Sequence, residues 1–193
     1  MNPDLPQNIP SILPDAYPSN WIETVHLKDD AEVLLRPIRP DDAPRLQEGF
    51  QHLSPRSIYL RFLEPYKELP EKLAERLANL DYHTKMALVA EIHEGSQSRL
   101  VGVARYAILD QPGPRLAESA IVVVDEFQQR GLGRLLMNRL GSYAIQHGVD
   151  AFIATVHHTN GEVLRFIEHS GLPVNRRVIE SGIWEIQVSL KPD

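Results

Sequence analysis

The chain has 193 residues, contains no cysteine, and carries 20 Lys and Arg against 26 Asp and Glu, for a formal net charge of -6. This length favours a single domain, and the lack of cysteine excludes disulfides, thiolate metal sites and cysteine nucleophiles. The acidic balance argues against nucleic acid as a partner, because nucleic-acid binding normally needs a basic face that neutralises phosphates.

No segment of the sequence is typical of a membrane or exported protein. Its purely apolar runs, such as residues 120–124, are far shorter than the ~20 residues that span a bilayer. The N-terminus lacks the basic and apolar regions of a signal peptide, since its first lysine is Lys28. We therefore expect a cytoplasmic protein with no membrane partner.

The first twenty residues form a proline-rich segment. Proline fixes φ and removes an amide donor, and it recurs here every three or four positions, at Pro3, Pro6, Pro10, Pro14 and Pro18. Residues 1–20 are therefore predicted to be an extended tail. Packing is expected to begin at Trp21 and Ile22, so that residues 21–193 form the domain.

Beyond the tail, predicted strands and helices interleave. Apolar and β-branched runs bounded by turn residues indicate strands, at residues 33–38, 86–93, 99–109, 116–124 and 151–156 and in a final hairpin over 174–190 that turns at Ser181-Gly182. Helix starts and apolar stripes indicate helices, at residues 41–53, 55–62, 70–80, 131–146 and 161–169. This order predicts a mixed α/β or α+β sheet with one right-handed crossover, between the fourth and fifth strands.

Residues 117–134 are the segment most indicative of chemistry. A buried strand leads into a polar loop and then into a helix whose first turn holds Gly131 and Gly133. The first amides of a helix have no intrahelical partners and lie at the positive end of its dipole, so they attract phosphate. Glycine lets the backbone approach a phosphate closely, and Arg130 and Arg134 can add charge-assisted contacts.

Three phosphate-binding motifs can be compared with this segment. It is not a dinucleotide fingerprint, because Leu136 takes the place of the third glycine, and it is not a P-loop, because no Gly-Lys-Ser/Thr follows. Gln128-x-x-Gly131-x-Gly133 resembles the pyrophosphate-binding loop of the GCN5-related N-acetyltransferase (GNAT) superfamily. The alternative is a helix start without a ligand, but each glycine costs a helix roughly 1 kcal/mol relative to alanine.

The resemblance extends over residues 21–190, with Asn160 after the next strand and Gly171-Leu172 where the family has Gly-Phe. It implies the GNAT fold, a mixed central sheet of about seven strands with flanking helices, splayed between strands 4 and 5. It also implies that acetyl-CoA lies in a cleft between the strands that end at Val124 and Val156.

The same resemblance implies which residues hold acetyl-CoA. Backbone groups of Val122 and Val124 would pair with the pantetheine arm. The remaining contacts would come from the pyrophosphate loop and the following helix start, at Gln129, Arg130, Gly131, Leu132, Gly133, Arg134 and Asn160. Asn160 fits a helix N-cap equally well, and the two roles are compatible.

For catalysis, the resemblance implies a glutamate base at Glu118, where histone-type and protein-lysine acetyltransferases carry one. A lysine amine, with a pKa of ~10.4, must lose its proton before it attacks a thioester. The alternative for Glu118 is a solvated carboxylate at a strand end. Ile167 stands where many members have a tyrosine that protonates the leaving thiolate, but a thiol pKa of ~8.5 makes the anion a tolerable leaving group.

Residues 53–62 and 81–90 resemble the bacterial protein-lysine acetyltransferase branch of the family, here as a stand-alone domain; this branch commonly lacks the tyrosine. The helices around Tyr59 and Arg61 would then form the acceptor side, although ordinary helix packing is preferred for Tyr59, Leu60 and Phe62. The acceptor implied is a lysine-bearing protein.

The sequence predicts no metal site, since the adjacent His157 and His158 point to opposite faces of an extended strand and no HExxH pair is present. The predicted function is direct acetyl transfer from acetyl-CoA to a primary amine, because a chain without cysteine has no acyl-cysteine route. The alternatives are a small-molecule amine as acceptor, or a non-catalytic acyl-CoA-binding regulatory module. The edge of the final hairpin offers a surface for a homodimer.

Overall fold

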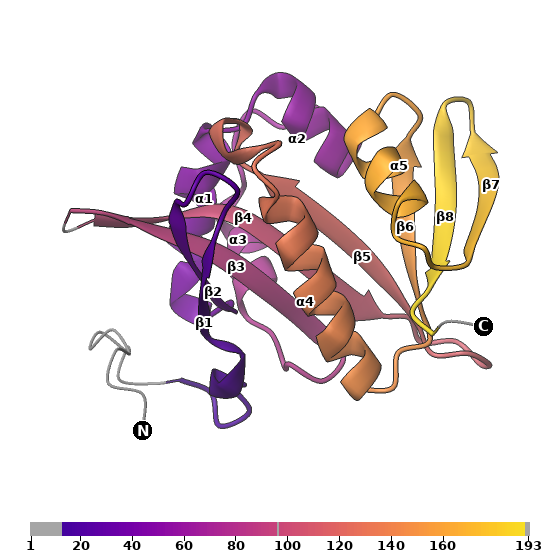
Figure 1. Cartoon of the computed structure of the whole chain (residues 1–193), viewed down its shortest axis with the longest axis horizontal. Coiled ribbons are helices and arrows are strands. Elements are labelled where there is room, and N and C mark those ends of the chain that lie inside the picture. Colours follow the sequence, from indigo (N-terminus) through magenta and orange to yellow (C-terminus); the bar gives the residue numbers. More distant parts are fainter. Residues whose placement is uncertain (1–12, 96, 192–193) are drawn as a thin grey trace.

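The computed structural model describes residues 13–95 and 97–191, which fold around a single eight-stranded sheet of order β1-β2-β3-β4-β5-β6-β8-β7 (Figure 1). The strands are β1 (Glu23–His26), β2 (Glu32–Pro37), β3 (Lys85–Glu94), β4 (Gln97–Ile108), β5 (Leu116–Val123), β6 (Ala151–His157), β7 (Val174–Glu180) and β8 (Ile183–Ser189). The helices are α1 (Ala43–Gln51), α2 (Pro55–Phe62), α3 (Glu71–Ala78), α4 (Leu132–Gln146) and α5 (Gly161–Glu168). Short 3-10 turns are η1 (Ser19–Trp21), η2 (Pro40–Asp42) and η3 (Asp125–Phe127).

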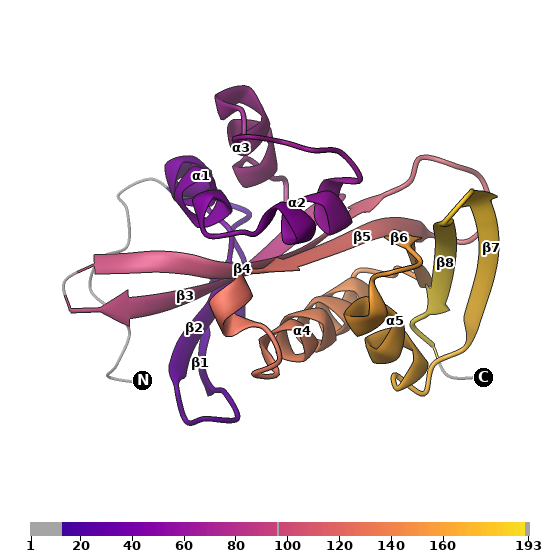
Figure 2. The ribbon, with the colours of Figure 1, turned by 90° about the horizontal axis from the view of Figure 1, so that it is seen from above.

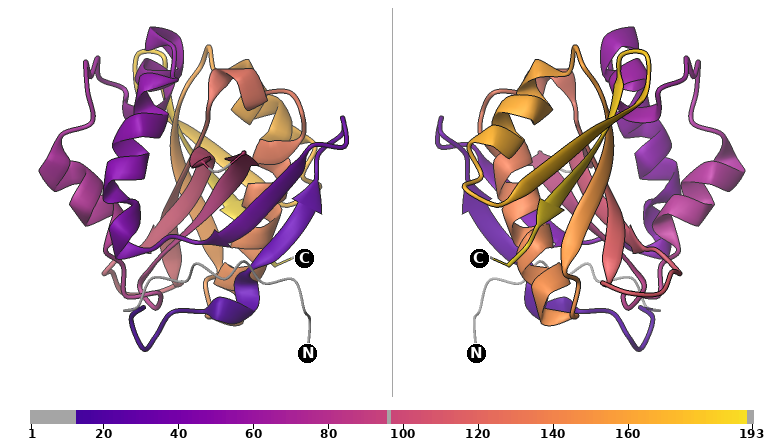
Figure 3. Two further views of the ribbon diagram at one scale, coloured as in Figure 1. Left: turned by 90° about the vertical axis from the view of Figure 1, so that its left-hand side faces the viewer. Right: turned by 90° about the vertical axis from the view of Figure 1, so that its right-hand side faces the viewer.

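Helices cover both faces of the sheet. α1, α2 and α3 lie on one face, and α4 and α5 lie on the other (Figure 2); Figure 3 shows the same layers end-on. On the α4 face, Leu132, Leu136 and Leu140 are fully buried, as their spacing on one stripe predicts. On the opposite face a second core gathers around Phe50, Ile58 and the buried side of β3.

The predicted elements are confirmed, and one strand is added to them. β1, the strand that the sequence did not reveal, has only four residues, none of them fully buried, and it pairs antiparallel with β2. Such a short strand carries too little apolar periodicity to be recognised. The sheet is mixed because β5 and β6 are parallel, joined by the α4 crossover, whereas the other pairs are antiparallel.

The predicted splay lies between β5 and β6. These strands pair only from Leu116 with Ala151 to Glu118 with Ile153. Beyond that point, β5 stays paired with β4 as far as Val123, and β6 stays paired with β8 as far as His157. The two strands therefore part towards their carboxyl ends, as the wedge between them in Figure 1 shows. A helix-capped opening of this kind is a common place for a ligand in α/β proteins.

The segment before β1 differs from its prediction. Pro3, Pro6 and Pro10 lie outside the described residues, but Tyr17 is 8% exposed and its hydroxyl donates to the Pro37 carbonyl at 2.9 Å. Its ring also meets Tyr82 edge-on at 5.6 Å. Among the described residues, packing on the domain thus already includes Tyr17, ahead of Trp21, because prolines prevent regular secondary structure without preventing the burial of an aromatic side chain between them.

No helix in the described parts of the chain is long and apolar enough to cross a membrane.

Candidate active site

The loop between β5 and α4 leaves the first amides of α4 open. Gly131 is the N-cap residue of α4, with φ 93, and no side chain caps the helix start. Gln129, two residues earlier, also has positive φ, at 60. Because the first N–H groups of a helix have no intrahelical partner, those that follow Gly131 are available to an anion, as the resemblance implies for Leu132, Gly133 and Arg134.

Gly133 is not required by the packing of the protein itself. A Cβ on this residue would meet Ile121 Cδ1 at 3.5 Å and Val123 Cγ2 at 3.8 Å, which are ordinary van der Waals contacts. Alanine would therefore fit and would favour the helix by roughly 1 kcal/mol. A glycine kept at this position is consistent with close approach of a ligand to the backbone, so the residues present fit a diphosphate.

The turn between β1 and β2 lies against this loop, which the sequence did not reveal. Arg130 Nε lies 2.6 Å from Asp29 Oδ2, and this close contact with Arg130 lowers the pKa of Asp29. The Arg130 guanidinium also stacks over Phe127, 4.4 Å from the ring centre. The aliphatic stem of Lys28 passes 3.5 to 3.9 Å from the position of a Gly131 Cβ. Asp29 thus already pairs with Arg130, while Lys28 brings a positive charge to the loop from far upstream in the sequence.

The register of β5 corrects the expectation for Val122 and Val124. Leu109 N donates to Leu116 O, and Val124 N donates to Val101 O, each at 2.9 Å, so the even-numbered residues of β5 direct their backbone groups to β4. In an antiparallel ladder the intervening residues face the other way. The backbone groups that face the opening therefore belong to Ile121 and Val123. Those of Val122 pair with β4, while Val124 donates to Val101 and its carbonyl accepts from Phe127 N.

Two glutamines tie the loop to its surroundings. Gln128 Nε2 donates to the Val123 carbonyl at 3.0 Å and to Ser57 Oγ at 3.2 Å, so its amide occupies one of the cleft-facing carbonyls. Gln129 Nε2 donates to Glu162 Oε1 at 3.1 Å, which links the loop to the first turn of α5. The loop is thereby attached to α2 on one side and to α5 on the other.

Asn160 and Ile167 belong to α5. Asn160 is the N-cap residue, and its side chain accepts a hydrogen bond from Val163 N at 3.4 Å, so the structural reading of this residue is confirmed. Ile167 is 6% exposed and packs with Val156 and Ile186. The position at which many family members have a tyrosine is thus a buried apolar contact with no proton to give.

Glu118 lies where the sheet divides. It is the last residue of β5 that pairs with β6, opposite Ile153, and its side chain is exposed. Since side chains alternate along a strand, Glu118 shares with Val122 the face that carries α1 and α2. There the Tyr59 ring lies 5.6 Å from the ring of His157 at the end of β6. Tyr59 is 40% exposed, so its ring packs against His157 at the surface and is not part of the core.

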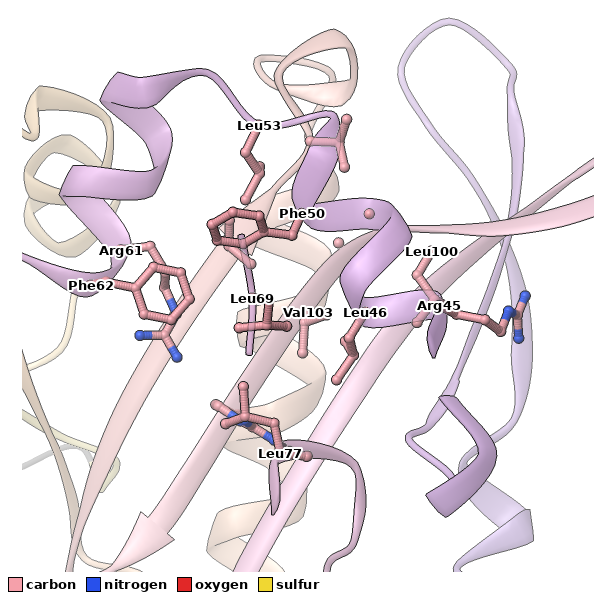
Figure 4. A pocket seen from close by; sticks show the side chains of 15 residues that line it. Arg45, Leu46, Phe50, Leu53, Arg61, Phe62, Leu69, Leu77, Leu100 and Val103 are labelled. Carbon is pink, nitrogen blue, oxygen red and sulfur yellow. Dashed lines mark hydrogen bonds between the residues drawn. The ribbon is translucent and has the colours of Figure 1, made fainter. Parts of the chain in front are cut away.

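On the same face of the sheet as Glu118 is a cavity of about 60 Å³ between α1, α2 and the strands β4 and β5 (Figure 4). Its walls are mostly apolar and include Phe50 and Phe62. Phe62 also packs against the core around Phe50, in agreement with the ordinary helix packing expected for it. Three arginines line the cavity as well: Arg45, Arg61 and Arg105. Figure 4 shows Arg61 and Phe62 extending from α2 towards the strands. The site therefore has an uncapped helix start on one face of the sheet, and on the other a cavity and the exposed carboxylate of Glu118.

Within the part of the chain that the structure describes, no group of three or more His, Asp or Glu side chains is arranged to hold a metal ion.

Comparison with known proteins places this geometry in a family. The sequence model described as "Acetyltransferase (GNAT) family" matches residues 51–172, more than half of the chain. Acetyltransferase PA5475 of Pseudomonas aeruginosa is 36% identical over 129 residues, which are 67% of each chain. Acetyltransferase Pat of Mycolicibacterium smegmatis is 30% identical over 154 residues, 80% of this chain but only 45% of Pat.

A solved structure agrees. The GNAT domain of S. lividans PAT superposes with a TM-score of 0.80 at 28% identity, over 90% of this chain and 99% of that domain. The sheet splayed between β5 and β6, the open start of α4 and the sequence match therefore lead to one conclusion: the chain belongs to the GNAT family and is an acetyl-CoA-dependent N-acetyltransferase.

Proposed function

We propose that the protein transfers the acetyl group of acetyl-CoA directly to the side-chain amine of a protein lysine, with Glu118 as the general base. The observation that carries this proposal is the position of Glu118, an exposed carboxylate on the last residue pair that joins β5 to β6. It lies at the root of the opening and on the face where α2 leaves room for an acceptor.

The cosubstrate supplies an activated acetyl thioester. The amides of Leu132, Gly133 and Arg134 would hold its diphosphate, because they are uncapped at the positive end of α4. Ile121, whose backbone groups face the opening, would pair with the amide-containing arm. The contacts of Gln128 with Val123 and Ser57 fix the shape of this edge of the opening.

Glu118 would take the proton of the acceptor ammonium. At neutral pH a lysine amine is protonated, because its ordinary pKa is ~10.4, and a positioned carboxylate both attracts the cation and accepts its proton. Ile167 offers no proton to the leaving thiolate, whose ordinary pKa of ~8.5 lets it depart as an anion. The chain contains no cysteine, so transfer without an acyl-cysteine fits its composition.

Support for a protein lysine comes from residues 53–62 and 81–90, which resemble the protein-lysine acetyltransferase branch, and from the open acceptor face. Tyr59 and His157 lie at its rim with their rings together. A small-molecule amine is the alternative acceptor.

The test is Glu118→Gln, with Glu75→Gln on the outer surface of α3 as the matched control. Free thiol release is followed with acetyl-CoA and a panel of lysine peptides and small amines. The kcat of the E118Q variant should fall by about 10²- to 10⁴-fold at pH 7, while its affinity for acetyl-CoA should equal that of the unmodified chain. E75Q should change neither kcat nor this affinity.

Two results would contradict the proposal. Equal activity of E118Q and the unmodified chain across pH 6–9 would remove Glu118 from the mechanism. Tight binding of acetyl-CoA with no turnover for any acceptor would favour a regulatory module instead, the reading that the buried Ile167 motivates.

A further inference from the structure

Two of the arginines that line the cavity on the Glu118 face of the sheet have no carboxylate partner. Within the described residues, no Asp or Glu oxygen lies within 4.0 Å of the guanidinium of Arg61 or Arg105. Arg45, in the same wall, pairs with Asp42 at 3.1 Å and with Glu91 at 2.9 Å. The cavity therefore contains two guanidinium groups that no carboxylate of the described residues contacts directly, although the charge of Glu118 acts on Arg61 at longer range.

The surroundings of the two side chains hold them in place. Arg105 donates a hydrogen bond to the Leu77 carbonyl at the end of α3. The Arg61 guanidinium lies 4.8 Å from the centre of the Phe62 ring. Burial lowers the pKa of Arg61, against an opposing effect of the Glu118 carboxylate. Burial, and next the positive charge of Arg61, lower the pKa of Arg105 to about 9.

Keeping these two guanidinium groups charged and without a carboxylate partner costs free energy, and a bound anion would remove that cost. Two half-buried guanidinium groups repel each other and lose hydration, and both penalties disappear when a carboxylate binds between them. A carboxylate also matches the forked geometry of the guanidinium donors. The cavity of about 60 Å³ has room for such a group, since one water needs roughly 10–15 Å³ of comparable space.

The position of this positive charge relative to Glu118 defines the kind of acceptor. Arg105 pairs across the ladder with Ala120, two residues along β5 from Glu118 and on the same face of the sheet. Two residues of a strand cover roughly 7 Å. An acceptor whose amine meets Glu118 therefore has a positive site a few ångströms further along the same surface.

We propose that Arg61 and Arg105 bind a carboxylate of the acceptor, so that the protein selects lysines with an acidic residue beside them. This inference rests on the proposed function, because it assigns the amine of the same acceptor to Glu118. The free α-carboxylate of a small amino acid offers the same chemistry, and the experiment distinguishes the two sources.

The experiment compares two lysine peptides that differ only in one flanking residue, Glu or Gln, as substrates of the unmodified chain and of Arg61→Met. The unmodified chain should prefer the acidic peptide by about tenfold or more in kcat/KM, as expected for a charge-assisted hydrogen bond. In R61M the ratio of the two values should fall to about one. The ratio is unaffected by the fraction of folded enzyme, because both peptides are measured on the same sample.

Two further variants act as controls. Arg76→Met removes an exposed arginine of α3 and should keep the full preference for the acidic peptide. Arg61→Lys retains a positive charge and should keep part of this preference. A ratio near one in the unmodified chain, or a full preference that survives in R61M, would overturn the proposal. Free lysine and lysinamide form the second arm: a preference confined to this pair would uphold the anion site and assign it to an α-carboxylate, against the flanking acidic residue.

Binding of the acetylated product peptides, measured by titration calorimetry, separates this inference from the proposed function. Tighter binding of the acidic product that depends on Arg61, without turnover of any amine, would uphold the anion site and contradict acetyl transfer. Turnover with equal binding and equal kcat/KM for both peptides would uphold acetyl transfer and overturn the anion site.

Discussion

At the scale of single residues, Gly131 and Gly133 lie in one loop for different reasons. Gly131 has φ 93, a left-handed conformation that disfavours any residue with a Cβ. Gly133 is helical, and a Cβ would make only ordinary contacts there. The fold therefore favours glycine at the first position, whereas the packing of the protein itself does not require it at the second.

Substitutions at these two positions should separate stability from binding. Gly131→Ala should lower the free energy of unfolding by about 1–2 kcal/mol, because alanine pays for the left-handed backbone. Gly133→Ala should keep or raise stability by up to about 1 kcal/mol. Gly133→Glu should remain folded and lose acetyl-CoA binding, because its bulk and negative charge occupy the diphosphate site. Thermal unfolding and calorimetric titration with acetyl-CoA check these outcomes, and retained affinity in G133E would refute the assignment of the loop.

Other residue-level features depend on register, which a sequence does not specify. The motif around Gly131 identified the loop, but the assignment of backbone groups to Val122 and Val124 was off by one residue. A shift of one residue exchanges the two sides of a strand, and only the pairing of Val124 with Val101 decides which side faces β4. Lys28 and Asp29 were missed for a related reason: nothing local in the sequence places the β1–β2 turn beside Gly131.

At the scale of elements, a buried group of charges fixes α1 on the sheet. Arg36 of β2 contacts Asp42 of η2 and Glu91 of β3, each at 2.7 Å, and Arg45 of α1 contacts the same two carboxylates. Arg36 is fully buried. Because α1 forms one wall of the cavity shown in Figure 4, this group positions the cavity as well as the helix.

The pH dependence of stability should reveal this group. Burial alone would raise the pKa of Glu91, but hydrogen bonds and charges from Arg45 and Arg36 lower it to about 2. Since the folded pKa lies below the unfolded one, the stabilisation is complete above about pH 4.5 and is lost as the pH falls towards 2. At 1.36 kcal/mol per pKa unit, it is of the order of 3 kcal/mol.

The Glu91→Gln variant should therefore have a lower free energy of unfolding than the unmodified chain at pH 7. This difference in free energy should shrink as the pH is lowered below 4.5. Denaturant titration at several pH values measures the difference. Glu75→Gln, on the exposed side of α3, is the control and should follow the unmodified chain throughout. A stability gap between E91Q and the unmodified chain that stays constant from pH 7 to pH 2 would contradict the assigned role of Glu91.

At the scale of the molecule, the two parts of the sheet meet over few residues. β5 and β6 share three residue pairs, and side chains around the opening add further links between the two parts. Arg56 of α2 donates to the Thr159 carbonyl at 3.1 Å, while Ser54 and Ser57 donate to Asp125. Helix α2 thus contacts both parts of the sheet at the mouth of the cleft.

Part of this arrangement could be predicted from the sequence, and part could not. The order of strands and helices, the crossover through α4 and the splay followed from local patterns and from the family resemblance, and all three are seen in the sheet. The contacts that join distant segments, such as Arg56 with Thr159 or Tyr17 with Pro37, leave no local signal because each partner alone looks like a surface or linker residue.

The segment before β1 gives a test at this scale. Tyr17 joins the core around Tyr82 and hydrogen-bonds to Pro37 at the end of β2. Tyr17→Ala should lower the free energy of unfolding of the whole domain by about 3–5 kcal/mol. Tyr17→Phe should lower it by about 1 kcal/mol, because one hydrogen bond is lost while the Pro37 carbonyl still accepts from Arg36 at 3.1 Å. Tyr66→Phe, on a half-buried ring, should stay within about 0.5 kcal/mol.

Chemical denaturation of the three variants measures these differences, and the unfolding transition should stay cooperative because Tyr17 packs on the same core as α4. An unchanged midpoint in Y17A would mean that the contacts of Tyr17 add nothing to the stability of the domain. A lower free energy of unfolding in Y17A, with no change in Y17F, would assign the effect to the ring and not to the hydrogen bond with Pro37. We expect the loss in free energy of unfolding to be largest for Y17A, smaller for Y17F and smallest for Y66F. This order is expected only if Tyr17 is part of the folded domain.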